Sequence, residues 1–126
     1  MVLGLSAAAG AQVTPIDILE KRGWDALAEG RAHDAADAFR QAIAVDAKNA
    51  RLFLGAGMAA MLERRDADAK RALDQALTLD PNLAQARVVL GQLIYRGGDL
   101  LGAIHTYEAL IARRPDDKEA IATLAK

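Results

Sequence analysis

The sequence has no cysteine, so disulfide bonds and thiolate metal sites are excluded. Its only two histidines, His33 and His105, lie far apart in the chain, and an isolated histidine lacks the partners that metal binding or acid–base catalysis needs. The sole serine, Ser6, lies in the alanine-rich N-terminal stretch and is not expected to act as a nucleophile. We therefore predict no catalytic residue, no metal ligand and no bound cofactor, and expect the chain not to be an enzyme.

A surplus of positive charge and a long apolar run are also missing. The chain has 16 lysine and arginine residues against 17 aspartate and glutamate residues, a formal net charge of −1. Nucleic-acid binding needs a dense basic face, so a nucleic-acid partner is not expected. No apolar run reaches the roughly 18 residues that a membrane span requires.

What the sequence does contain is alanine, leucine, arginine, glutamine and aspartate, with few aromatic or β-branched residues. Hydrophobic residues make up 52% of the 126 residues, enough to bury a core in one compact unit. The dominant residue types favour helices over strands. The composition therefore predicts an all-α fold.

The sequence repeats itself with a period of 34 residues. Each period holds two runs with helical apolar spacing, separated by turn-prone residues such as Gly30-Arg31, Arg64-Arg65-Asp66 and Gly97-Gly98-Asp99. Five rows of similar residues keep the same register without an insertion, which is typical of a repeat protein. The rows are Gly23, Gly57 and Gly91; Ala35, Ala69 and Ala103; Phe39, Leu73 and Tyr107; Ala42, Ala76 and Leu110; and Ala47, Pro81 and Pro115.

This order of small, large and small residues resembles the tetratricopeptide repeat, whose pattern places a glycine, an Ala-x3-Phe and a proline at these positions. The third unit, 84–117, is most similar to the family pattern, and the first, 16–49, is least similar; the second is 50–83. The resemblance implies a right-handed α–α superhelix of three repeats. Residues 118–126 have the apolar spacing of a further first helix, so we expect either a truncated fourth repeat or a short cap helix.

Residues 1–13 are expected to lie outside the fold. Ala9-Gly10-Ala11 has the small-x-small form of a signal-peptidase site, but a positively charged n-region is missing. Two interpretations stay open, a truncated signal peptide over 1–11 or an alanine-rich leader without function. Localisation is open with them: cytoplasmic, or periplasmic or secreted if the signal interpretation holds.

One motif imitates a cofactor site. Gly55-Ala56-Gly57 followed by Ala60 resembles the dinucleotide-binding fingerprint. The fingerprint works only between a strand and a helix of a parallel sheet, and Gly57 instead belongs to the glycine row of the repeat. We therefore interpret it as helix packing.

In tetratricopeptide folds the first helices of successive units line a concave surface that binds peptides, and this resemblance implies the candidate site. The places that face this groove include Asp17, Lys21, Leu27, Gly55 and Val89. The apolar strip predicted along its middle consists of other residues, with charged residues only at its rims. The predicted peptide-binding residues are Trp24, Leu54, Met58, Met61, Leu62, Val88, Gln92, Tyr95 and Arg96. Methionine, tryptophan and tyrosine are typical of adaptable contact surfaces.

One family subtype is not expected. Family members that clamp an acidic C-terminal tail use lysine and asparagine at places where this chain has Glu20, Trp24 and Gly55, and the tail would meet Asp17. The sequence therefore predicts a protein-interaction scaffold that binds an apolar peptide or helix. Two alternatives stay open: the N-terminal module of a longer, exported enzyme whose catalytic domain follows residue 126, or a structural repeat that self-associates as a homo-oligomer.

Overall fold

The computed structural model describes residues 14–113, and over this range the chain forms six α-helices and no strand. The all-α repeat fold is therefore confirmed. The expected leader (1–13) and the expected start of a fourth repeat (118–126) lie outside the described residues. The helices are α1 (Pro15–Ala28), α2 (Ala32–Val45), α3 (Ala50–Leu62), α4 (Asp66–Leu79), α5 (Ala84–Arg96) and α6 (Leu100–Arg113).

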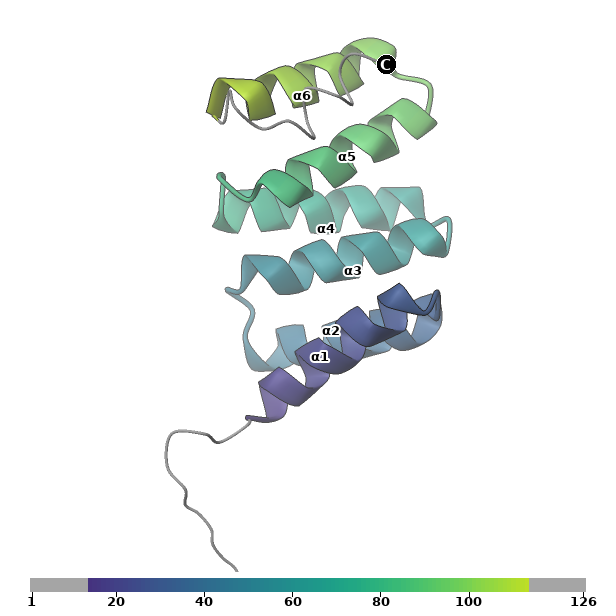
Figure 1. The fold of residues 1–126 in the computed structure, drawn as a ribbon, viewed down its shortest axis with the longest axis vertical. Coiled ribbons are helices and arrows are strands. Elements are labelled where there is room, and N and C mark those ends of the chain that lie inside the picture. The colour runs from purple at the N-terminus through teal and green to yellow at the C-terminus, as the bar shows by residue number, and fades with distance from the viewer. Residues whose placement is uncertain (1–13, 114–126) are drawn as a thin grey trace, which may run out of the picture.

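The helices are stacked along the longest axis of the molecule, from α1 and α2 at one end to α6 at the other (Figure 1). Each helix packs against the next one in the chain, and α3 also contacts α1 and α5. The first helices of the three helix pairs therefore lie against one another and form one face of the stack. We propose that the units divide between residues 49 and 50 and between residues 83 and 84, so that each unit contains one helix pair.

Local hydrogen bonds determine where the helices begin. Thr14 and Asp17 form a capping box at the start of α1, with Pro15 as its first residue. The Thr14 hydroxyl accepts from the Asp17 amide at 3.2 Å, and the Asp17 carboxylate accepts from the Thr14 amide at 3.1 Å. These bonds lower the pKa of the Asp17 carboxyl below its usual value. At α3, the Asn49 side chain accepts from the amide of Arg51 at 3.1 Å, which satisfies a donor of the first turn.

The turn inside each helix pair needs a left-handed residue at the same place. Gly30 has φ 75° and Gly98 has φ 93°, and Arg64, midway between them in the repeat, has φ 62°. Each of these turns contains the pair of backbone hydrogen bonds that commonly ends a helix, for example from the amide of Arg65 to the carbonyl of Ala60 at 2.9 Å. Glycine adopts this conformation without strain, whereas Arg64, which has a Cβ atom, is held there in an unfavourable backbone conformation.

The glycine row packs against the row of large residues. An ideal Cβ atom on Gly91 would lie 2.5 Å from the Tyr107 ring, and one on Gly57 would lie 2.8 Å from Leu73. Phe39 lies between two glycines, because Cβ atoms on Gly23 and on Gly55 would come within 2.7 Å and 2.3 Å of its ring. These glycines allow close helix crossings, both within a unit and between Phe39 of the first unit and α3 of the second.

Candidate functional site

The face formed by α1, α3 and α5 has a hollow of about 280 Å³ that draws on all three helices. Its lining is mostly apolar and includes two methionines, with one amide and one guanidinium at the α5 side. We name this hollow the inner groove. It is lined by Leu27, Met58, Met61, Leu62, Val89, Gln92 and Arg96.

Five of the predicted peptide-binding residues line the inner groove: Met58, Met61, Leu62, Gln92 and Arg96. They come from the second and third units, so the fold brings together side chains up to 38 residues apart in sequence. Leu62 is the most accessible apolar residue among them, with 53% of its surface exposed. An exposed leucine beside half-buried methionines leaves apolar surface available for a contact.

Two predicted residues do not belong to this surface. Leu54 is fully buried among Leu73, Val89 and their neighbours, and Val88 is buried against Tyr107 and the end of α6. The prediction that these two side chains line the groove was wrong. They occupy equivalent places in α3 and α5, and this place points toward the core because both helices are covered on several sides.

Two residues outside the predicted apolar strip line the inner groove instead of Leu54 and Val88. Leu27 of α1 and Val89 of α5 line the inner groove, and Leu27 supplies the apolar contribution of the first helix. Both belong to the places that the family resemblance assigns to this face. Sequence spacing does not favour them over Leu54 and Val88, because all four residues lie one helical turn from Met58 or its equivalents Trp24 and Gln92.

Trp24 is half-buried and connects the groove face to the core. Its ring meets Phe39 edge-on, with centroids 5.0 Å apart, and it packs against the buried clusters of both the first and the second unit. Its indole Nε1 donates to Glu20 Oε2 at 3.2 Å, and the Arg51 guanidinium carbon lies 5.1 Å from the ring centroid. Trp24 therefore stabilises the junction between the first two units, whatever it contacts from outside.

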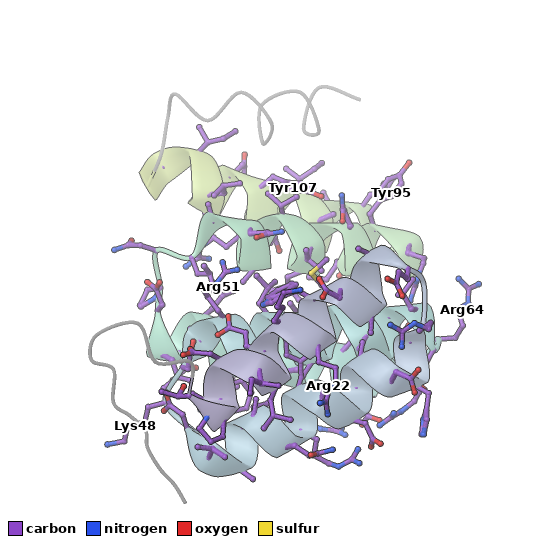
Figure 2. All side chains as sticks on the ribbon, turned by 60° about the horizontal axis from the view of Figure 1, so that its bottom comes forward. Arg22, Lys48, Arg51, Arg64, Tyr95 and Tyr107 are labelled. Atoms are coloured by element: carbon purple, nitrogen blue, oxygen red, sulfur yellow. The ribbon has the colours of Figure 1, made fainter. Side chains whose placement is uncertain are left out.

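Tyr95 differs from Trp24 in its surroundings. Its side chain is 61% exposed and projects outward near the end of α5, away from α1 and α2 (Figure 2). It occupies the place that Met61 has in α3 and Leu27 has in α1. Tyr95 is thus an accessible aromatic residue beyond the inner groove, on the same row of the repeat.

The positive charges near the groove are matched by carboxylates. Arg96 forms an ion pair with Asp66 of α4 and also lies 3.5 Å from the Met61 carbonyl oxygen. The Nε atom of Arg51 lies 3.8 Å from Glu20 Oε2. A carboxylate ligand would have to compete with these partners, so the groove offers apolar contacts more readily than anion binding.

A second hollow, of about 330 Å³, lies on the opposite side between α2 and α4. No feature of the sequence pointed to it. Its floor is formed by Phe53 and several alanines, and its rim carries Arg40, Arg65 and Arg71. These arginines are ion-paired with Asp37, Glu63 or Asp68, and the hydrogen bond from Arg65 lowers the pKa of Asp68.

Within residues 14–113, no group of three or more histidine, cysteine, aspartate or glutamate side chains is placed to hold a metal ion. None of the six described helices is both long and apolar enough to cross a membrane.

Comparisons with known proteins agree with the repeat pattern. The family model described as tetratricopeptide repeat matches residues 20–82 and 67–118. No curated protein sequence matches the chain closely enough to count as a relative.

Several solved structures share the fold. The first tetratricopeptide domain of Spaghetti (RPAP3), bound to the HSP90 peptide SRMEEVD, has a TM-score of 0.80 and 21% identity, over 87% of this chain and 89% of that one. The second such domain of human RPAP3, in complex with the HSP70 peptide SGPTIEEVD, has a TM-score of 0.77 and 26% identity, over 85% and 89%. The Sgt2 domain from Aspergillus fumigatus has a TM-score of 0.81 and 23% identity, over 89% and 76%.

Proposed function

Because the chain belongs to the tetratricopeptide repeat family, we propose that it is a non-catalytic protein-interaction scaffold that binds an apolar peptide or helix in the inner groove. The observation that carries this proposal is the inner groove itself, a mostly apolar hollow built jointly by α1, α3 and α5. Two structurally similar domains were solved with peptides, which supports peptide binding as the general mode.

The expected ligand differs from the acidic peptides of those two structures. Glu20 accepts a hydrogen bond from the Trp24 indole, and the Gly55 backbone is packed on Phe39, so neither place offers a cation. Arg51 and Arg96 are held by carboxylates. Apolar side chains of a ligand would instead pack on Leu62 and on Met58 and Met61, whose flexible thioether side chains adapt to different shapes.

Binding of a defined peptide tests the proposal. Peptides selected from a random display library against the full chain should be rich in apolar residues and should change the fluorescence of Trp24, the only tryptophan. Leu62→Glu should weaken their binding at least about tenfold, or about 1.4 kcal/mol. Val45→Glu is the matched control, since Val45 is 62% exposed at the end of α2 and does not line the inner groove.

The peptides SRMEEVD and SGPTIEEVD provide the opposite test. We expect the chain to bind them more weakly than the selected apolar peptides. Tight binding of either peptide that is insensitive to Leu62→Glu would contradict the proposed groove chemistry. The longer-enzyme alternative makes a separate prediction, namely that a catalytic domain follows residue 126 in the encoding gene.

A further inference from the structure

The sulfur atoms of the described residues all belong to the inner groove. The sequence has no cysteine and three methionines, so thioethers are its only sulfur groups. Met1 lies outside the described residues, and the other two, Met58 and Met61, both line the hollow between α1, α3 and α5. Any oxidation of sulfur within residues 14–113 therefore falls on the surface that an apolar ligand would contact.

The two methionines share one face of α3. They are three residues apart, which places their side chains next to each other along the helix. Each is partly buried, packs against the core cluster that includes Leu54 and Leu73, and also lines the hollow. The hollow measures about 280 Å³, several times the size of a hydrogen peroxide molecule. A peroxide can therefore reach this lining while the chain stays folded.

The methionine pair lies at the middle of the groove face. The equivalent residues are Trp24 and Leu27 in α1, and Gln92 and Tyr95 in α5, none of which contains sulfur. The pair thus belongs to α3, the helix that contacts both α1 and α5. A chemical change on α3 alters the groove where the contributions of all three first helices meet.

We propose that Met58 and Met61 form an oxidation site through which a peroxide lowers the affinity of the inner groove for its ligand. This inference rests on the proposed function, because it concerns the regulation of that same surface. In the reaction the thioether sulfur donates an electron pair to one oxygen of hydrogen peroxide, so that an S–O bond forms and the O–O bond breaks. The leaving hydroxide takes the proton of the transferred oxygen. The sulfur is thereby oxidised to the sulfoxide, and the peroxide is reduced to water.

A sulfoxide oxygen makes this part of the groove polar. In the free protein the oxygen is hydrated. An apolar side chain of the ligand would remove that water without supplying a hydrogen-bond donor, which makes binding less favourable. The change is reversible, because a methionine sulfoxide reductase removes the oxygen as water while two thiols are oxidised to a disulfide.

The test compares the full chain before and after treatment with dilute hydrogen peroxide, using an apolar peptide selected against the untreated chain. Mass spectrometry of the tryptic fragment 52–64, which contains both methionines, should show one added oxygen on each. The affinity for the peptide should fall at least about tenfold, or about 1.4 kcal/mol, and treatment with the reductase and a thiol should restore it. Helical circular dichroism should stay unchanged throughout.

The matched control is the double variant Met58→Leu/Met61→Leu. Leucine keeps the apolar surface and nearly the volume of methionine, so the variant should fold and bind the peptide. It retains Met1 and Trp24, and any effect of oxidation at those residues would persist in it. Peroxide should leave its affinity unchanged. Recovery with the reductase is a second check on the wild type, since this enzyme acts on the sulfoxide.

Four results would contradict the proposal. Methionines 58 and 61 that stay reduced in the folded chain, or an oxidised chain with unchanged affinity, would overturn it. An equal loss of affinity in the double variant would assign the effect to another residue. A loss of helix in the oxidised chain would show unfolding instead of a change at the groove. The proposed function is tested separately, because Leu62→Glu is measured without peroxide: peptide binding that resists Leu62→Glu would overturn that function, whereas binding sensitive to Leu62→Glu but not to peroxide would overturn only the oxidation site.

Discussion

Replacing Trp24 with alanine separates a structural role from a binding role at the groove face. The substitution removes a half-buried indole that packs against Phe39, accepts the Arg51 cation over its ring and reaches the buried clusters of two units. We expect the variant to fold but to be clearly less stable.

The magnitude follows from these contacts. Truncating a fully buried tryptophan costs about 3–5 kcal/mol, so the half-buried Trp24 should contribute about 2 kcal/mol from burial. The edge-on contact with Phe39 adds about 1 kcal/mol. The cation–π contact with Arg51, whose side chain is largely exposed, adds about 0.5 kcal/mol. We expect a total loss of about 3.5 kcal/mol in the free energy of unfolding.

Urea unfolding followed by far-ultraviolet circular dichroism measures this loss, since the variant has no tryptophan fluorescence. Trp24→Phe should lose less than Trp24→Ala, because it keeps a ring against Phe39 and gives up only the hydrogen bond to Glu20. Tyr95→Ala is the control. Its ring is 61% exposed, so its stability should change by no more than about 0.5 kcal/mol.

A loss below about 1 kcal/mol for Trp24→Ala would refute the reasoning, because half-buried packing alone predicts more. That result, together with weakened binding of a selected apolar peptide, would reassign Trp24 to the binding surface alone.

Three further predictions concern helix packing, turns and caps. Gly91→Ala should destabilise the fold by about 1–3 kcal/mol in urea unfolding, since its Cβ atom has no room, whereas Gly97→Ala, with its nearest neighbour at 3.5 Å, should be nearly neutral. Arg64→Gly should raise the melting temperature by relieving a left-handed backbone worth about 1 kcal/mol; a lower melting temperature would contradict this account. Thr14→Ala should cost about 1 kcal/mol through the lost cap. It should also raise the pKa of the Asp17 carboxyl, which NMR titration measures. In the wild type the lowered pKa stabilises the folded state at pH values above the usual carboxyl range, and this stabilisation is lost as the pH falls through the folded-state pKa. The stability of Thr14→Ala should therefore depend less on pH.

Much of the fold follows from local features of the sequence. The turn-prone residues at Gly30-Arg31, Arg64-Arg65 and Gly97-Gly98 fall between the helices of each pair, and the repeat rows place glycine opposite a large residue in every unit. These features depend on backbone preference and on a period of 34 residues, both of which can be read along the chain. The left-handed Arg64 could have been predicted from its register with Gly30 and Gly98.

The orientation of individual side chains on the first helices could not be predicted in the same way. α3 is apolar nearly all round, because it contacts α1, α2, α4 and α5. Hydrophobic periodicity identifies a face only when one side of a helix meets water. For this reason Leu54 and Val88 were assigned to the groove although they are buried, and Leu27 and Val89 contribute to its lining.

The sequence by itself thus determined the helices, their pairing and the kind of protein, because each of these depends on spacing that recurs along the chain. Only the tertiary structure decided which apolar residues of α3 and α5 remain accessible, and that Trp24 belongs partly to the core. These properties depend on what covers each side chain from neighbouring units, and a linear pattern does not contain that information.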